Sequence, residues 1–213
     1  MFRLVLRLMA CNPAGIMRFS RIIPLLFLMT VPAIAAPKEI EIPKDDWASH
    51  DPIIALTKEA KWTPLREVDV QDGSLEVRIW FVTVTPSHGI RLCRNGDKWS
   101  AFYVAAGLEG YQSFQIRELK PQTDWASLWK KVEGLGISTL PDSWTLPYER
   151  YARDGVEVDI KDGIAYVVEI NDGKHYRTYM YCNPQYLKSP EAKKIIEIIK
   201  ALGEELLPGK KIT

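Results

Sequence analysis

The sequence predicts an α+β fold, an antiparallel sheet of about six strands with amphipathic helices covering one face. Stretches rich in β-branched and aromatic residues are separated by short turn dipeptides, which indicates that neighbouring strands pair antiparallel. Other stretches have apolar residues at helical spacing. The expected order along the chain is one helix, four strands, a second helix, a hairpin and a last helix.

The first helix and the first four strands are predicted from local signals. The helix is expected to begin at Asp51-Pro52. The dipeptides Asp72-Gly73 and Asn95-Gly96 predict turns, because Asp, Asn and Gly tolerate positive φ. The strands are expected over Ser74–Thr85, Gly89–Arg94, Lys98–Ala106 and Tyr111–Leu119.

Two amphipathic helices are predicted in the second half of the chain. Thr123 can cap the first of them and Gly134 can end it. Its apolar stripe consists of Trp125, Leu128, Trp129 and Val132. In the last helix, Ser189-Pro190-Glu191 supplies a cap, a proline in the first turn and an acid near the positive end of the helix dipole. Its apolar face consists of Ala192, Ile195, Ile196, Ile199 and Leu202.

A hairpin is predicted from Ile164–Ile170 and His175–Cys182 across Asp172-Gly173. A two-residue turn there pairs Asn171 with Lys174. Strand alternation then places one set of side chains on a common face, namely Ile164, Tyr166, Val168, Ile170, Arg177, Tyr179 and Tyr181.

The composition limits the class of protein. The chain has 213 residues, of which 46% are hydrophobic and 26% charged. This ordinary globular composition excludes collagen-like, disordered and low-complexity proteins. The net charge of +1 excludes a strongly basic nucleic-acid-binding protein. Residues 36–207 are predicted to form a single α+β domain that starts with an extended leader at Pro37–Asp46, and residues 208–213 to form a tail.

Residues 1–35 are predicted to be a signal peptide, which places the protein in the periplasm or outside the cell. Arg18 and Arg21 form a basic region, Ile22–Val31 is almost wholly apolar, and Ala33-Ile34-Ala35 is a small-residue cleavage pattern. Cleavage is expected after Ala35. A stable membrane span needs about 20 apolar residues, so this run is too short. Removal takes away four of the 28 basic residues and leaves 24 against 27 acidic ones, a net charge of −3 that suits nucleic acid poorly.

Three alternatives stay open at the N-terminus. The segment could be an uncleaved anchor. Residues 1–16 could be an upstream mis-start, with Met17 as the true first residue. Leu8-Met9-Ala10-Cys11 looks like a lipoprotein cleavage box, although Arg3 and Arg7 interrupt the short apolar stretch before it.

Two cysteines remain after cleavage, Cys93 and Cys182. An even number in an exported protein predicts one disulfide between them. The alternative is two buried thiols that pack as small apolar side chains. Two cysteines with no histidine at finger spacing do not form a zinc site.

No catalytic, metal or cofactor motif is found, so no cofactor is predicted and enzyme activity stays open. His50, His88 and His175 are not at metal-ligand spacing. Ser127-Leu128-Trp129-Lys130 matches the S-x-x-K pair of penicillin-recognising enzymes without their other motifs. Four acids recur near glycines, namely Asp154, Asp159, Asp162 and Asp172. Because the EF-hand spacing is absent, hairpin turns explain them better than a calcium site does.

Aromatic residues are the unusual feature, with seven tryptophans and nine tyrosines. Core packing is the default for most of them, but some could form an exposed platform for a sugar or a peptide. Arg177, Tyr179 and Tyr181 are the predicted binding residues, because strand alternation puts all three on one face and Arg and Tyr are favoured at interfaces. The alternative is that this is a structural face of the sheet.

Turn, cap and aromatic strand positions form a pattern between Leu128 and Ile199. They are Leu128-Trp129, Gly136-Ile137, Leu140-Pro141-Asp142, Asp162-Gly163, Tyr166, Glu169, Tyr176-Arg177, Tyr179, Tyr181-Cys182-Asn183-Pro184 and Pro190-Glu191-Ala192. This pattern covers about a third of the chain and resembles one in an uncharacterised family of exported bacterial proteins. The resemblance implies no named activity and no catalytic residues.

The sequence therefore predicts an exported, envelope-associated module that binds an envelope protein, a peptide or a glycan through the face carrying Arg177. It predicts no nucleic-acid partner and no stable membrane span. One alternative is a small envelope hydrolase, which needs a polar cleft that joins His88 or His175 to a carboxylate such as Glu169. Another is a structural subunit whose aromatic residues are buried between chains.

Overall fold

The computed structural model describes residues 38–43, 46, 48, 50–83, 87–106, 114–147, 152–153, 156–157 and 163–209, all within the unit Ala36–Thr213. The predicted signal peptide with its cleavage point lies outside the described residues. So do Asp154-Gly155, Asp159, Asp162 and the expected strand start at Tyr111. Within the described ranges, no helix combines the length and the apolar character that crossing a bilayer requires.

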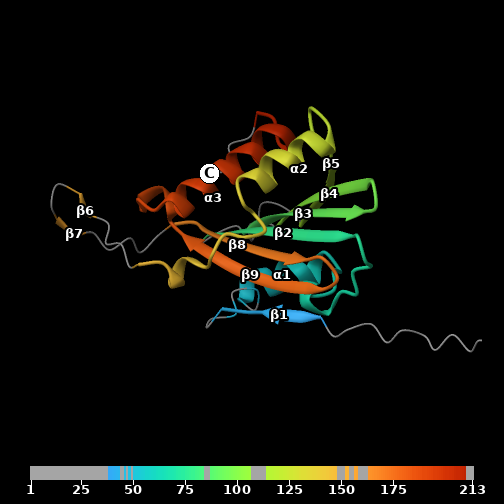
Figure 1. Ribbon diagram of the computed structural model, residues 1–213, viewed down its shortest axis with the longest axis horizontal. Coiled ribbons are helices and arrows are strands. Elements are labelled where there is room, and N and C mark those ends of the chain that lie inside the picture. Colours follow the sequence, from blue (N-terminus) through green and yellow to red (C-terminus); the bar gives the residue numbers. More distant parts are fainter. Residues whose placement is uncertain are drawn as a thin grey trace, which may run out of the picture. The chain divides into compact units, whose positions relative to one another are not determined.

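The protein has an α+β fold built on a mixed, mostly antiparallel sheet of seven strands (Figure 1). In sheet order the strands are β1 (Glu39–Glu41), β9 (His175–Cys182), β8 (Ala165–Asn171), β2 (Leu75–Val82), β3 (His88–Asn95), β4 (Lys98–Ala105) and β5 (Gln115–Leu119). The predicted α+β class is confirmed. The additional strand is β1, which comes from the expected leader and pairs parallel with β9. A separate two-stranded pair consists of β6 (Ala152–Arg153) and β7 (Val156–Glu157).

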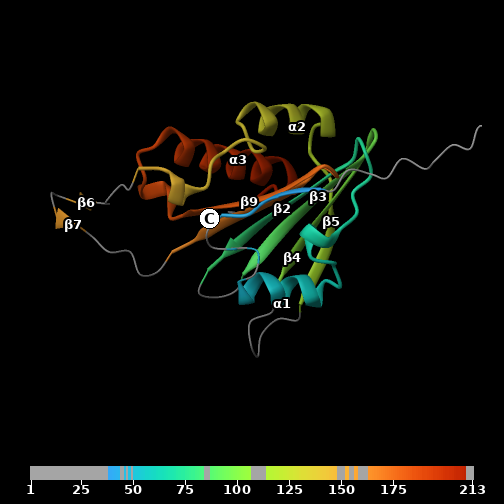
Figure 2. The same cartoon turned by 60° about the horizontal axis from the view of Figure 1, so that its bottom comes forward.

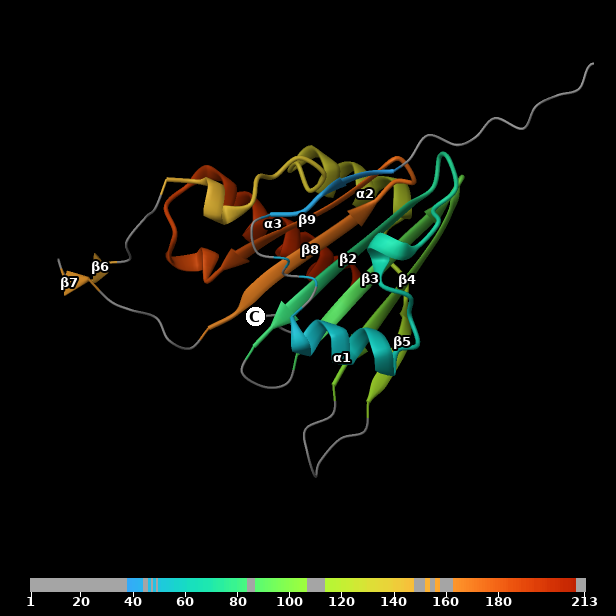
Figure 3. The same ribbon diagram turned by 90° about the horizontal axis from the view of Figure 1, so that it is seen from below.

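Three helices pack on the sheet. They are α1 (Asp51–Glu59), α2 (Trp125–Gly134) and α3 (Pro190–Leu206). Short 3₁₀ turns follow α1 and α2 and precede α3, and these are η2 (Leu65–Glu67), η3 (Ser143–Thr145) and η4 (Pro184–Tyr186). Figures 2 and 3 show α2 and α3 on one face of the sheet, here called the α3 face, and α1 on the opposite face, called the α1 face. The prediction that helices cover one face only is therefore wrong for α1.

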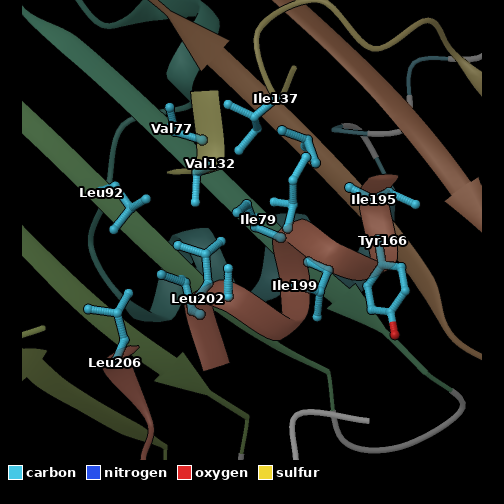
Figure 4. Packing of buried hydrophobic residues seen from close by; sticks show 14 of the residues in the cluster. Val77, Ile79, Leu92, Val132, Ile137, Tyr166, Ile195, Ile199, Leu202 and Leu206 are labelled. Carbon is cyan, nitrogen blue, oxygen red and sulfur yellow. The ribbon is translucent and has the colours of Figure 1, made fainter. Parts of the chain in front are cut away.

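The central strand β2 explains why both faces are covered. All but the last of its residues are buried, because apolar side chains alternate onto both faces. Val77 and Ile79 join the larger core beneath α2 and α3 (Figure 4), whereas Trp80 joins a smaller core with α1. The smaller core consists of Ile53, Leu56, Trp80, Val104, Val167 and Met180.

The helix caps agree in part with the prediction. Ser189 caps α3 as expected, and its hydroxyl accepts a hydrogen bond from the Ala192 amide. The cap of α2 is Asp124 rather than Thr123, because the Asp124 carboxylate accepts the Ser127 amide at 2.9 Å. Thr123 instead donates from both its amide and its hydroxyl to the Glu205 carboxylate of α3.

The hairpin of β8 and β9 forms with a register two residues away from the predicted one. Tyr166 faces Tyr181, and Asn171 faces Tyr176. The connection is longer than two residues because the Asp172 carboxylate accepts the amides of Lys174 and His175. A shift by two leaves every side chain on its predicted face, since strand side chains alternate with period two.

The predicted disulfide is corrected by the structure: Cys93 and Cys182 are free thiols. Cys93 lies on β3, which is three strands from β9 in the sheet order. Cys182 ends β9, six residues beyond the position of β9 that is level with Cys93. The separation is about 14 Å across the sheet and about 20 Å along it, whereas a disulfide needs Cα atoms within about 7 Å.

Candidate functional site

The structure places two of the three predicted binding residues, Tyr179 and Tyr181, in the interior, whereas Arg177 is half-buried and lines a cavity near the start of β9. Arg177, Tyr179 and Tyr181 do share one face of β9, as the alternation predicts. That face is the α3 face, and both tyrosines are 0% exposed within the larger core. The expectation of an exposed aromatic platform is therefore corrected for Tyr179 and Tyr181, which α2, α3 and the loop between α2 and η3 cover.

The polar atoms of the three residues hold this loop in place. The bonds run from Tyr179 Oη to Ile137 O (2.7 Å), from Tyr181 Oη to Pro141 O (2.9 Å) and from Arg177 Nη2 to Leu140 O (2.9 Å). Asp142 completes the attachment, since its Oδ2 accepts the Met180 amide of β9 at 2.9 Å. The pattern of Arg and Tyr thus attaches this loop to the α3 face of β9.

A buried ion cluster lies on the α1 face of β2 and β3. The Glu76 carboxylate accepts the Arg78 Nε hydrogen bond at 2.8 Å, and Arg91 Nε and Nη2 donate to its two oxygens at 2.8 and 2.9 Å. Burial alone would raise the pKa of Glu76, but the hydrogen bond from Arg91 and the charges of both arginines lower it. The Trp62 ring lies over both guanidinium groups, with its centroid 5.5 Å and 5.1 Å from their central carbons.

A second buried carboxylate faces this cluster from β8. Glu169 is the strand partner of Arg78, yet no ion pair joins the two in the described part of the chain. Instead Glu169 accepts hydrogen bonds from Trp80 Nε1 at 2.6 Å and from Tyr176 Oη at 3.0 Å. Burial raises the pKa of Glu169, against the opposing effects of the Arg78 charge and of these two bonds.

One donor of this network is left over. Arg78 is 1% exposed, and its Nη1 has no hydrogen-bond partner among the described residues. Its Nε and Nη2 both face Glu76, so Nη1 lies on the opposite edge of the guanidinium group. A buried donor without a partner costs about 1–3 kcal/mol, and native proteins leave few of them.

A cavity of about 300 Å³ lies against the network on the α1 face. Its polar lining includes Arg78, Glu169 and Tyr176 from the sheet. Its remaining lining comes from α1 and from the segments on either side of it, and consists of Ala48, Ile53, Ile54, Thr57, Lys58, Trp62, Pro64, Leu65 and Arg66. Its size is at the lower end of the range of ligand pockets, and the combination of apolar walls with a few polar groups is typical of them.

Two residues outside the cavity keep it in shape. Asn171 is 0% exposed, and its Nδ2 donates to the carbonyls of Leu65 and Val68 at 2.9 and 3.0 Å, which fixes the η2 turn to the sheet. Gly89 lies opposite Trp80, and a Cβ at this position would come within 2.5 Å of the indole. The glycine therefore leaves room for the ring that binds Glu169.

The charged groups around the mouth of the cavity are mainly basic. Lys58 of α1 and Arg66 of η2 both line it. Arg66 forms an ion pair with Asp46 at 2.8 Å, so part of its charge is compensated. Glu169 is the one acidic side chain in the described lining.

His88 and His175 do not reach this site. His88 lies on the α3 face, stacked on Phe81 with ring centroids 4.5 Å apart. His175 is exposed, lies on the α3 face of β9 and is 3.2 Å from the Asp172 carboxylate. Neither shares a face with Glu169. His175 instead lines a different cavity together with Asp172 and Glu39, whose carboxylates lie 3.2 and 3.6 Å from its ring nitrogens, so the hydrolase alternative stays a prediction. Among the described residues, no group of three His, Cys, Asp or Glu side chains is placed to hold a metal ion.

Sequence reasoning missed the ion cluster and the cavity, although a signal was present. Glu76 and Arg78 interrupt the otherwise apolar strand LEVRIWFV at alternate positions, and Glu169 interrupts the strand AYVVEIN in the same way. Charged residues inside strands that are buried on both faces need partners, so their shared face was a candidate site.

Comparison with known proteins adds no relative. No family model, no curated protein sequence and no solved structure matches this chain. The resemblance to exported bacterial proteins therefore stays a prediction, and the functional argument depends on the geometry alone.

Proposed function

We propose that the protein is an exported module that binds a small organic ligand in the cavity on the α1 face. The observation that carries the proposal is Arg78, a charged side chain that is 1% exposed, lines the cavity and has an unpartnered donor nitrogen within the described chain. Buried polar groups are normally paired in native proteins. A ligand that supplies an acceptor atom in the cavity would complete this network.

The apolar part of the cavity supports the same function. Ile53, Trp62 and Leu65 offer a hydrophobic wall beside the polar floor, which is the usual division between the part of a pocket that supplies affinity and the part that orients a ligand. Trp62 is held by its contacts with Arg78 and with Trp80, whose ring centroid is 6.2 Å from its own. A fixed aromatic wall loses little entropy on binding.

The location of the protein enters the proposal through its predicted signal peptide. If residues 1–35 direct export, the ligand is an envelope component or a solute outside the cytoplasm. This changes the predicted mode of binding: the partner is a small molecule in a pocket, in place of a protein, peptide or glycan on the Arg177 face.

Chemical-shift mapping of purified, ¹⁵N-labelled protein against a library of small organic molecules tests the proposal. We expect binders to shift the amide signals of residues around the cavity, such as Thr57, Leu65 and Tyr176. Trp62→Ala should weaken their binding at least tenfold. Trp144→Ala is the matched control, because Trp144 is 66% exposed and is not among the described lining residues, and it should leave binding unchanged.

Two results would contradict the proposal. The first is a library in which no molecule shifts the cavity signals. The second is binding that Trp144→Ala weakens as much as Trp62→Ala does, since this would place the ligand elsewhere.

A further inference from the structure

We propose that the cavity takes an apolar monocarboxylate, whose head group binds Arg78 Nη1 and whose body packs against Trp62. This inference rests on the proposed function and specifies its ligand class. It is carried by the orientation of one guanidinium group, by the charge of the network around it and by the apolar wall of the cavity.

The guanidinium geometry limits the head group. Glu76 occupies the Nε and Nη2 edge of Arg78, at 2.8 and 2.7 Å, and the buried Nη1 is the nitrogen of this guanidinium group without a hydrogen-bond partner among the described residues. One nitrogen with two N–H groups matches the oxygens of a small anion, and hydrogen bonds to ionised acceptors are roughly twice as strong as neutral ones.

The charge of the network favours a single negative charge on the ligand. Arg78 and Arg91 share the one carboxylate of Glu76, which leaves a net charge of one positive unit in these three side chains. Glu169 lies on the neighbouring strand, and burial raises its pKa, which opposes a compensating charge at that position. A monoanion bound at Nη1 would neutralise the cluster, whereas a dianion would reverse its sign.

The remaining walls define the ligand body. Ile53, Pro64 and Leu65 line the cavity beside the Trp62 ring, and none of them offers a side-chain hydrogen-bonding group. A volume of about 300 Å³ accommodates a body the size of one aromatic ring or a short alkyl chain. Lys58 and Arg66 at the same cavity add attraction for an anion as it approaches.

Matched ligand pairs test the inference on the wild-type protein, so that no variant has to fold. Isothermal titration calorimetry compares hexanoate, phenylacetate, 3-phenylpropionate and indole-3-acetate with the corresponding primary amides, which keep the body and remove the charge. We expect at least one acid to bind at least tenfold more tightly than its amide. If no acid binds more tightly than its amide, the monocarboxylate assignment is overturned, while amides or other neutral molecules that still shift the cavity signals would leave the binding function intact.

Variants then separate Arg78 from the rim. Lys58→Ala and Arg66→Ala should keep most of the preference for the acid, because these side chains do not form the proposed head-group site. Arg78→Lys keeps the charge but removes the guanidinium fork, and it should reduce the preference to less than threefold. Loss of the preference in the two rim variants would overturn the assignment to Arg78, even if Arg78→Lys fails to fold.

Discussion

Replacing Glu76 by Gln perturbs the network at the carboxylate that joins both arginines. The substitution preserves the shape of the side chain and removes its charge, so Arg78 remains buried at 1% exposure without an anionic partner. Breaking a buried ion pair by removing one partner costs about 3–5 kcal/mol. Since domains of this size are stable by only about 5–15 kcal/mol, the loss should be large.

The pH dependence of this loss follows from the lowered pKa of Glu76. A carboxyl group with a folded-state pKa below its unfolded value of about 4.3 contributes stability that is fully present above that value and is lost as the pH falls through the folded pKa. The free-energy difference between wild type and Glu76→Gln should therefore be full at pH 7. It should shrink as the wild-type carboxyl group becomes protonated.

Urea unfolding followed by circular dichroism from pH 7 to pH 3 measures both effects. Glu118→Gln is the control, because Glu118 is an exposed acid on β5 and its replacement should change the free energy of unfolding by less than about 0.5 kcal/mol. Two results would refute the reasoning. The first is a free energy of unfolding for Glu76→Gln within about 1 kcal/mol of the wild-type value at pH 7. The second is a difference between the two free energies that does not depend on pH.

Four further predictions concern residues that position the site or the sheet. Tyr179→Phe should lower the free energy of unfolding by about 1–2 kcal/mol in urea titrations, because a buried backbone carbonyl loses its donor. Asn171→Ala should cost about 2–4 kcal/mol and speed amide hydrogen exchange in the η2 segment, which loses its attachment to the sheet. Gly89→Ala should lower the melting temperature through a cost of about 1–3 kcal/mol, since its methyl group would collide with the tryptophan on β2. In the native protein, the exposed Cys182 should react with a thiol reagent before Cys93, because burial raises the pKa of Cys93 to about 11. If neither cysteine reacts until the protein is reduced, the two form a disulfide after all.

Local sequence patterns predicted most of the secondary structure. A strand is present at each of the six predicted places, with the predicted bounds for β9 and shifted ends for the others, and the start signals at Asp51-Pro52 and Ser189 mark true helix starts. These signals are short-range, since caps, turns and alternation depend on residues a few positions apart. The prediction that Thr123 caps α2 was wrong because Thr123 binds Glu205 of α3, a contact across 82 positions in the sequence.

The candidate site required contacts that no local pattern encodes. Alternation correctly grouped Tyr179 with Tyr181, but it does not determine which face of a strand is covered. The cavity itself depends on Asn171 reaching Leu65, across 106 positions in the sequence, and on α1 packing against the face opposite α3. The binding prediction therefore grouped the right residues on one face, but it placed Tyr179 and Tyr181 on the surface when they lie in the core.

The most direct test of the account is a crystal structure of the protein with a bound monocarboxylate such as 3-phenylpropionate. The account predicts a carboxylate oxygen about 3 Å from Arg78 Nη1 and the apolar body against the Trp62 ring. A ligand bound outside the cavity, or an Arg78 Nη1 that donates to Glu169 while the ligand lies elsewhere, would contradict it.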